Sequence, residues 1–247
     1  MSSRIAYVTS GMGGVGTAIC QALARSGHTV VAGCAPDSPR RAAWLAAQKA
    51  LGFHFIASEG DVTDWASTTR AFGAVQRELG PIDVLVHNAG RSCERHFRDM
   101  APSDWQAVIR GNIDSLFNVT KQVVDGMMER RFGRIVLMAS LTGGQGRVRE
   151  VNYATAKAAA QGFTRSLAQE LAPHGITVNT VSPGHIAGAG ARTPPPDVLQ
   201  QLAAATPVRR LGRPEEVASL CNWLASDDAA FMTGVDFPVN GGALTGR

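Results

Sequence analysis

A tyrosine and a lysine stand four residues apart, as Tyr153 and Lys157, in an alanine-rich stretch that reads as helix from Asn152 to Leu171. Residues at this spacing are neighbours on one face of a helix, so the phenol and the ammonium are expected side by side. A charge about 4 Å away is worth up to about 4 kcal/mol at an effective dielectric constant of ~20, and about 1.4 kcal/mol corresponds to one pKa unit. The pair therefore predicts a phenol whose pKa is lowered toward the range of general acid–base catalysis.

A serine precedes this helix and adds a second hydroxyl. Ser140 ends the apolar run that begins at Arg134. Such a hydroxyl can hold a substrate oxygen while a phenol supplies the proton. The alternative is that Tyr153 and Lys157 form an ordinary amphipathic helix pair. Motifs elsewhere in the chain are needed to choose between the two interpretations.

A glycine-rich segment lies between the first expected strand and the first expected helix. Its residues are Ser10, Gly11, Met12, Gly13, Gly14, Val15 and Gly16. Glycines at that place let the backbone approach a pyrophosphate, which then accepts hydrogen bonds at the positive end of the helix. The segment predicts nucleotide binding.

The end of the second expected strand bears on which nucleotide binds. A site for NAD usually carries Asp or Glu there for the ribose 2′-hydroxyl, and this chain carries Cys34 instead. Arg40 and Arg41 follow and suit a 2′-phosphate, so the predicted cofactor is NADPH. Asp37 is the competing carboxylate, and the alternative for the two arginines is a solvated first helical turn.

The composition, with 45% hydrophobic and 18% charged residues, fits one globular α/β domain spanning residues 1–247. We expect a cytoplasmic protein, because the N-terminus lacks the apolar stretch of a signal peptide and no segment approaches the ~20 apolar residues of a membrane span. The four cysteines form no C-x-x-C pair and the six histidines are scattered, so neither disulfides nor a metal site is expected. The positive charges behind the net charge of +4 are dispersed, which argues against nucleic acid as a partner.

Apolar runs alternate with helical patterns along the chain. Strands that are nearly all apolar, each followed by a helix, predict an α/β fold with a doubly wound parallel seven-stranded sheet and helices on both faces, the Rossmann fold. The expected strands span residues 4–9, 28–33, 53–57, 82–87, 134–140, 176–181 and 235–239. The expected helices span residues 15–26, 40–51, 65–79 with Asp64 as cap, 102–130, 152–171, 197–205 and 214–225.

A segment rich in proline and glycine runs from Pro183 to Pro196 between a strand and a helix. It is expected at the carboxyl edge of the sheet, where these folds place their sites. The two interpretations are a loop that closes over a ligand and a mobile surface loop.

The order of these motifs resembles that of the short-chain dehydrogenase/reductases over essentially the whole chain. The residues that carry the resemblance are the glycine loop, Asn88-Ala89-Gly90, Asn112, Ser140, Tyr153 with Lys157, and Pro183-Gly184. The resemblance implies that Tyr153 donates a proton, that Lys157 lowers its pKa and binds the nicotinamide ribose, that Ser140 holds the carbonyl, and that Asn112 keeps a water in the proton relay. It also implies cofactor contacts by Asp61, Val62, Asn88, Ala89, Gly90, Pro183, Gly184 and Ile186.

Further runs are similar to the branch of this family that reduces acetoacetyl-CoA for polyhydroxybutyrate synthesis. These runs are residues 4–9, 30–34, 48–53, 56–60 and 115–122. They imply hydride transfer from NADPH to the 3-keto carbon of an acyl thioester, giving the (R)-3-hydroxy thioester. Reductases of 3-oxoacyl carrier proteins share the general motifs but fewer of these runs. Another alcohol or ketone oxidoreductase and a nucleotide-sensing protein without catalysis are the remaining alternatives.

The resemblance also implies a substrate wall and an assembly. The expected wall residues are Glu94, Arg147, Val148, Glu150 and His185. The acetoacetyl-CoA-reducing branch tends to carry Gln, Phe, Gln and Tyr at the last four, so the wall is more charged here, and His185 can equally be a residue that only fills space. Arg91, Arg95, Arg147 and Arg149 are either phosphate contacts or ordinary surface charges. The helices at 112–130 and 152–171 are those through which the family forms homotetramers, unless their alanines pack on the sheet.

Overall fold

The computed structural model describes residues 3–188 and 195–244. Seven strands form one sheet in the order β3-β2-β1-β4-β5-β6-β7, and all neighbouring pairs in it are parallel. The strands are β1 (Ile5–Thr9), β2 (Thr29–Cys34), β3 (Ile56–Glu59), β4 (Val84–His87), β5 (Gly133–Met138), β6 (Ile176–Pro183) and β7 (Asp236–Val239). The strand order reverses between β1 and β4, which is the point where such sheets bind their ligands.

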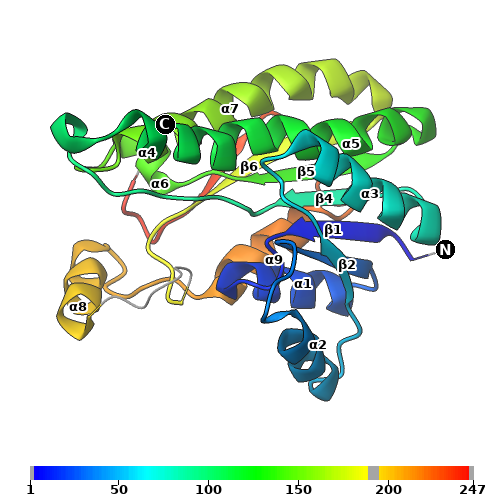
Figure 1. Cartoon of the computed structure of the whole chain (residues 1–247), viewed down its shortest axis with the longest axis horizontal. Coiled ribbons are helices and arrows are strands. Elements are labelled where there is room, and N and C mark those ends of the chain that lie inside the picture. The colour runs from blue at the N-terminus through cyan, green and yellow to red at the C-terminus, as the bar shows by residue number, and fades with distance from the viewer. Residues whose placement is uncertain (1–2, 189–194, 245–247) are drawn as a thin grey trace.

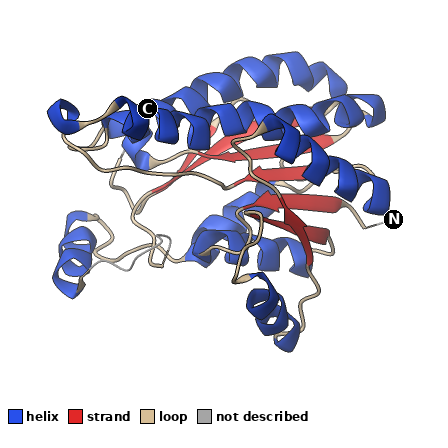
Figure 2. Ribbon diagram, viewed as in Figure 1, coloured by secondary structure: helices blue, strands red, loops and turns tan. Residues whose placement is uncertain are grey.

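Helices cover both faces of the sheet, as Figure 1 and Figure 2 show. One layer contains α3 (Trp65–Leu79), α4 (Pro102–Ile109), α5 (Ser115–Arg130) and α7 (Val151–Leu171). The other layer contains α1 (Gly14–Arg25), α2 (Arg41–Ala50) and α9 (Pro214–Leu224). Shorter elements are α6 (Leu141–Gln145), α8 (Pro196–Ala205), the 3-10 helices η1 (Phe97–Asp99) and η3 (Ala172–His174), and the π-helical turn η2 (Arg110–Asp114). The predicted doubly wound seven-stranded sheet is confirmed.

The strands are apolar on both faces because each face packs on a helical layer. In β1, Ile5 and Tyr7 join the core under the α3, α5 and α7 layer, whereas Ala6 and Val8 join the core under α1 and α9. Tyr7 stacks on the fully buried Phe72 of α3, with ring centroids 4.1 Å apart. Two cores therefore hold the sheet from opposite sides.

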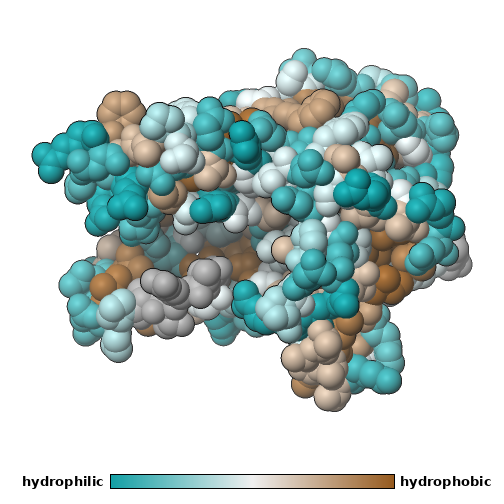
Figure 3. Space-filling view, in the orientation of Figure 1, coloured by the Kyte–Doolittle hydropathy of each residue, from teal (hydrophilic) through white to brown (hydrophobic). Residues whose placement is uncertain are grey.

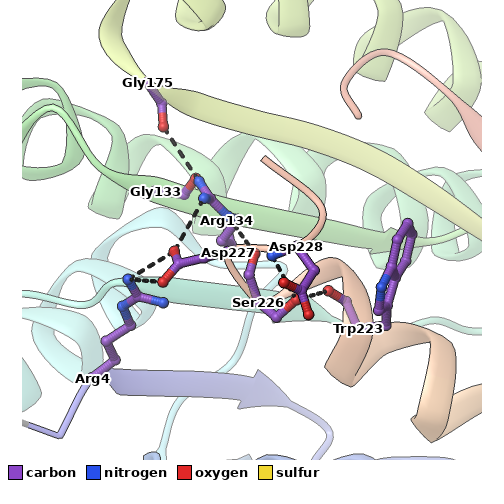
Figure 4. A network of polar contacts seen from close by, with 8 residues as sticks. All are labelled: Arg4, Gly133, Arg134, Gly175, Trp223, Ser226, Asp227 and Asp228. Carbon is purple, nitrogen blue, oxygen red and sulfur yellow. Dashed lines mark hydrogen bonds and ion pairs between the residues drawn. The ribbon is translucent and has the colours of Figure 1, made fainter. Parts of the chain in front are cut away.

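The amino edge of the sheet is closed by a polar network, drawn in Figure 4. Asp227 bridges the guanidinium of Arg4, at 2.9 Å, and that of Arg134, at 3.6 Å. Arg134 also donates to the carbonyl oxygens of Ser226 and Gly175, at 3.1 and 3.3 Å. These contacts join the starts of β1, β5 and β6 at the edge opposite to the one where nucleotide sites lie.

The structure corrects three of the expected elements. The strand expected at 53–57 lies at Ile56–Glu59, because Phe55 instead stacks on Trp44 of α2, at 5.3 Å. The helix expected at 102–130 is interrupted by the π-helical turn, where polar side chains bond to backbone carbonyls. The strand expected to reach Ser140 ends at Met138, because Ser140 caps α6. The helix boundaries at 65 and 79 and the Asp64 cap are confirmed.

Candidate active site

A long groove crosses the carboxyl ends of β1 and β4. Two cavities of about 530 Å³ each form its halves, and both are lined by Ser10, Gly13, Gly90 and Arg91, so they are continuous. In the space-filling view the surface is hollowed between the layer that holds α4 and the part that holds α8 (Figure 3). A groove with two joined halves suits a dinucleotide.

The glycine loop forms the floor where the halves meet. Helix α1 begins directly after Gly13 and has no acidic residue in its first turn, which leaves its positive end open to an anion. A Cβ atom on Gly16 would lie 2.2 Å from the Ser10 carbonyl oxygen, so only glycine fits there. Ser10 itself has a φ of +51°, in the left-handed region that favours glycine. The loop therefore keeps its shape although a serine stands at that position.

Tyr153 and Lys157 lie together in one half of the groove, as the spacing predicts. The Lys157 Nζ lies 5.6 Å from the centroid of the Tyr153 ring and donates a hydrogen bond to the Met138 carbonyl oxygen at 2.7 Å. Ser140 lies in the same half and caps α6, with its Oγ accepting from the Thr142 N–H at 3.2 Å. The end of β5 thus supplies both the serine and the carbonyl that holds the lysine.

The pKa of Tyr153 corrects the prediction made from spacing. Burial raises the pKa of the phenol above its ordinary value of 10.0, the hydrogen bond with Ser140 lowers it by less, and the charge of Glu150 raises it further. Burial also lowers the pKa of Lys157 to about 8. The predicted lowering of the phenol's pKa is wrong, because removal from water outweighs the hydrogen bond with Ser140, which is the one contribution that lowers it. The phenol therefore keeps its proton at neutral pH and can act as an acid.

Asn112 occupies the π-helical turn and is 2% exposed. Its Nδ2 donates to the Arg91 carbonyl oxygen at 2.6 Å and to the Val108 carbonyl oxygen at 2.8 Å. Its Oδ1 is buried and has no partner among the residues that the structure describes. A Cβ on Gly90 would lie 2.8 Å from this oxygen and 3.3 Å from Lys157 Nζ, so both atoms face the same small space. An unpaired buried acceptor beside a cation is a place for a polar hydrogen.

Most of the residues expected to bind cofactor line the groove. The half that leads away from the catalytic residues is lined by Ser10, Met12, Gly13, Arg40, Asp61, Val62, Ala89 and Gly90. The catalytic half is lined by Gly14, Val15, Gly16, Asn88, Ser140, Tyr153, Lys157, Pro183, Gly184 and Ile186. Gly11 instead packs below the loop, where its Cβ would lie 2.9 Å from Ala32 Cα.

The two arginines expected at the cofactor separate in the structure. Arg40 lines the groove, whereas Arg41 forms an ion pair with Glu59 on β3 and does not line it. The competing carboxylate of Asp37 is exposed and also lies outside the lining. Sequence reasoning missed Ser38, Thr63 and Arg110 in the same half, because nothing in their local pattern marks them as neighbours.

The expected substrate residues lie outside the lining of the catalytic half. Arg147 pairs with the buried carboxylate of Glu150 at 3.2 Å. Glu94 is exposed, and Val148 is 78% exposed. His185 lines a smaller cavity of about 120 Å³ together with Ile186, and burial followed by the charge of Arg147 lowers the pKa of His185. The loop expected to close over a ligand falls partly on residues 189–194, outside the described residues.

The parallel doubly wound sheet, the glycine loop and the grouping of Ser140, Tyr153 and Lys157 define a nucleotide-dependent oxidoreductase. Residues 11–244 match a family model described as Enoyl-(Acyl carrier protein) reductase. The chain belongs to the short-chain dehydrogenase/reductase family, and this membership implies a nicotinamide cofactor.

Similar proteins cover essentially the whole chain. It is 57% identical to an acetoacetyl-CoA reductase of Cupriavidus necator over 246 residues, covering 100% of both chains. It is 46% identical to nodulation protein G of Azospirillum brasilense, covering 98% of each. It is 37% identical to a 3-oxoacyl-(acyl-carrier-protein) reductase of Escherichia coli, covering 97% of this chain and 96% of that protein.

Two features are absent from the described residues. None of their helices has both the length and the apolar character that a bilayer crossing requires. Across residues 3–188 and 195–244 there is no group of three His, Cys, Asp or Glu side chains placed to hold a metal ion.

We predict that Glu150→Gln lowers the pKa of Tyr153, because it removes a negative charge that disfavours the phenolate. The chain has two tyrosines, and burial raises the pKa of the other, Tyr7, to about 12. Phenolate absorbance after rapid alkaline mixing should therefore show a first ionisation that moves to lower pH in Glu150→Gln and vanishes in Tyr153→Phe. Glu170→Gln, an exposed glutamate on the same helix, is the matched control and should leave the ionisation in place. An unmoved ionisation in Glu150→Gln would contradict the prediction.

Proposed function

We propose that this chain is an NADPH-dependent reductase of 3-ketoacyl thioesters that converts acetoacetyl-CoA to (R)-3-hydroxybutyryl-CoA. The observation that carries the proposal is the grouping of Ser140, Tyr153 and Lys157 in one half of a groove whose floor is the glycine loop. The 57% identity to an acetoacetyl-CoA reductase over the whole chain supports the substrate.

The residues present fit a nicotinamide dinucleotide. Gly13 to Gly16 would hold the diphosphate, since the loop is open toward the start of α1 and closed to a side chain at Gly16. Asp61 and Val62 would flank the adenine at the outer end of the groove. Tyr153 and Lys157 would bind the nicotinamide ribose, and Ile186 would meet the carboxamide.

Each catalytic side chain has a separate role in the proposed reaction. NADPH, when bound, supplies the hydride that the 3-keto carbon accepts. Ser140 Oγ holds the ketone oxygen, and its bond from the Thr142 N–H leaves the hydroxyl proton available for donation. Tyr153 gives its proton to the ketone oxygen as negative charge develops there. The phenol has this proton to give, because its raised pKa keeps it protonated at neutral pH. Lys157 places a positive charge near the Tyr153 ring, and Asn112 Oδ1 offers an acceptor for a water that would return a proton to the phenol.

The 2′-phosphate of NADPH would meet Arg40. This guanidinium lines the outer half of the groove together with Ser38, and no carboxylate of β2 or of Asp37 lines that half. A planar guanidinium matches a phosphate in shape and charge. Arg41 would contribute mainly by neutralising Glu59, with which it is paired.

A second candidate is the reduction of 3-oxoacyl groups carried by an acyl carrier protein. The 37% identity to such a reductase of Escherichia coli over nearly the whole chain favours it. Arg91, Arg95 and Arg149 are exposed, and a backbone hydrogen bond of 2.8 Å joins residues 95 and 149. Such a basic rim suits the phosphates of coenzyme A and an acidic carrier alike, so kcat/KM for the two forms of substrate decides between them.

We also propose that the chain works in the cytoplasm, in polyhydroxybutyrate synthesis, as a homotetramer. On the outer helical layer, Phe117 of α5 stacks on Trp65 of α3, and their side chains are 56% and 46% exposed. Ala156 and Ala160 on α7 pack inward, whereas Ala158 is exposed and would be free to meet a second copy. A monomer mass in light scattering would contradict the tetramer.

We predict that the purified protein oxidises NADPH in the presence of acetoacetyl-CoA, with a higher kcat/KM than with a longer 3-ketoacyl substrate. Tyr153→Phe removes the acid and should lower kcat by roughly 10²- to 10⁴-fold. NADPH binding, measured by fluorescence, should persist in this variant because the groove is otherwise unchanged. Wild-type protein that binds NADPH and turns over no 3-ketoacyl thioester would refute the proposed function.

We predict that Arg40→Ala lowers kcat/KM for NADPH by roughly tenfold to a hundredfold, the worth of one charge-assisted hydrogen bond. The value for NADH serves as the internal control and should stay nearly constant, because NADH has no 2′-phosphate. Arg41→Ala should have the smaller effect on NADPH. Equal losses for both cofactors, or a larger loss in Arg41→Ala, would contradict the assignment.

A further inference from the structure

A buried histidine lies between the cofactor groove and the turn that carries Asn112. His87 ends β4 and its side chain is 2% exposed. Its Nδ1 is 3.0 Å from Thr9 Oγ1, and its Nε2 is 3.1 Å from Ser115 Oγ. Thr9 ends β1, and Ser115 begins α5 directly after the π-helical turn. One imidazole ring therefore connects two strands of the switch point to the helical layer above them.

The direction of each hydrogen bond follows from counting donors and acceptors. Thr9 Oγ1 accepts from the N–H groups of Asn88 and Ala89, both at 2.9 Å, which uses its two lone pairs. Its single proton must therefore go to His87 Nδ1. The histidine proton then lies on Nε2 and is donated to Ser115 Oγ.

The chain of bonds ends at the turn that holds Asn112. Ser115 Oγ donates to the Gly111 carbonyl oxygen at 3.0 Å, inside the π-helical turn. Gly111 precedes Asn112, whose amide is fixed by the Arg91 and Val108 carbonyl oxygens. At the other end of the chain, Thr9 holds the backbone of Asn88 and Ala89, which line the groove.

We propose that His87, as the neutral Nε2–H tautomer, is a positioning residue that sets the π-helical turn of Asn112 relative to the groove-lining segment Asn88–Gly90. The proposal rests on the proposed function, because Asn112 matters to catalysis only if the groove performs a proton transfer. Loss of the bond between His87 and Thr9 would free the Asn88–Gly90 segment, and loss of the bond between His87 and Ser115 would free the π-helical turn.

The surroundings keep the ring neutral. Burial and, as the smaller cause, the positive charge of Lys157 together lower the pKa of His87 to about 3. A protonated ring would donate from both nitrogens and could no longer accept from Thr9. Lys157 thus acts on His87 through its charge and also lies near Asn112, since its Nζ faces the space shared with Asn112 Oδ1.

The first test is spectroscopic and needs no substrate. In ¹⁵N-histidine spectra of the wild-type protein, the His87 ring should show a proton on Nε2 and none on Nδ1, unchanged between about pH 5 and pH 9. In Ser115→Ala, which removes the bond to Gly111, the side-chain amide signals of Asn112 should shift. A proton on Nδ1, or Asn112 signals that stay in place, would overturn the proposal.

The second test separates the two ends by kinetics. Ser115→Ala frees only the Asn112 end, so kcat should fall roughly tenfold to a hundredfold with KM for NADPH nearly unchanged. His87→Leu frees both ends and should also raise KM for NADPH. His87→Gln offers one acceptor and one donor and should recover part of kcat. A fall in thermal stability with unchanged kcat and KM in all three would mean a structural role alone and would overturn the proposal.

The control is His28→Leu. His28 is half-buried, bonds through Nδ1 to the Leu23 carbonyl oxygen at 3.1 Å, and lies away from the groove lining, so kcat should not change. Wild-type protein that shows the Nε2–H tautomer and the Asn112 shift but reduces no 3-ketoacyl thioester would refute the proposed function and leave the positioning role standing.

Discussion

The structure of the site depends on one cation that is held out of water. Lys157 is 6% exposed, and its Nζ donates to the carbonyl oxygen of Met138 at the carboxyl end of β5. Removing an ammonium from water is costly, and the cost appears as a pKa lowered to about 8. The elements around it fit closely: a Cβ on Gly143 of α6 would lie 2.7 Å from the Lys157 carbonyl carbon, so α6 can pack on α7 only through a glycine. The fold places the Lys157 charge in the groove, where it can take part in catalysis as well as in binding.

Burial acts on the two partners of the pair in opposite directions. It raises the pKa of the Tyr153 phenol and lowers that of the Lys157 ammonium, because in each case it disfavours the charged form. At neutral pH the phenol is therefore protonated and the lysine is charged. This is the combination that a proton donor beside a developing oxyanion requires, and it explains why a tyrosine of raised pKa suits the direction of reduction.

Much of this arrangement could be predicted from the sequence because local rules govern it. The Asp64 cap fixes the start of α3, the glycine loop fixes the start of α1, and the spacing of Tyr153 and Lys157 fixes their shared face. What could not be predicted depends on contacts between distant segments. Arg41 pairs with Glu59 of a neighbouring strand instead of lining the groove, and Asn112 in the π-helical turn bonds to the Arg91 carbonyl oxygen, 21 residues away in the sequence. The direction of the Tyr153 pKa shift was missed for the same reason, since burial is a property of the packed chain.

The depressed pKa of the buried Lys157 ammonium can be measured directly. The chain contains three lysines, so NMR spectra of protein labelled at the lysine side chains are simple, and the Lys157 signal is the one absent in Lys157→Met. We predict that this signal titrates near pH 8, well below the ordinary value of 10.5. A Lys157 signal that titrates at its ordinary value would show a solvated side chain and would contradict the burial of this cation in the site.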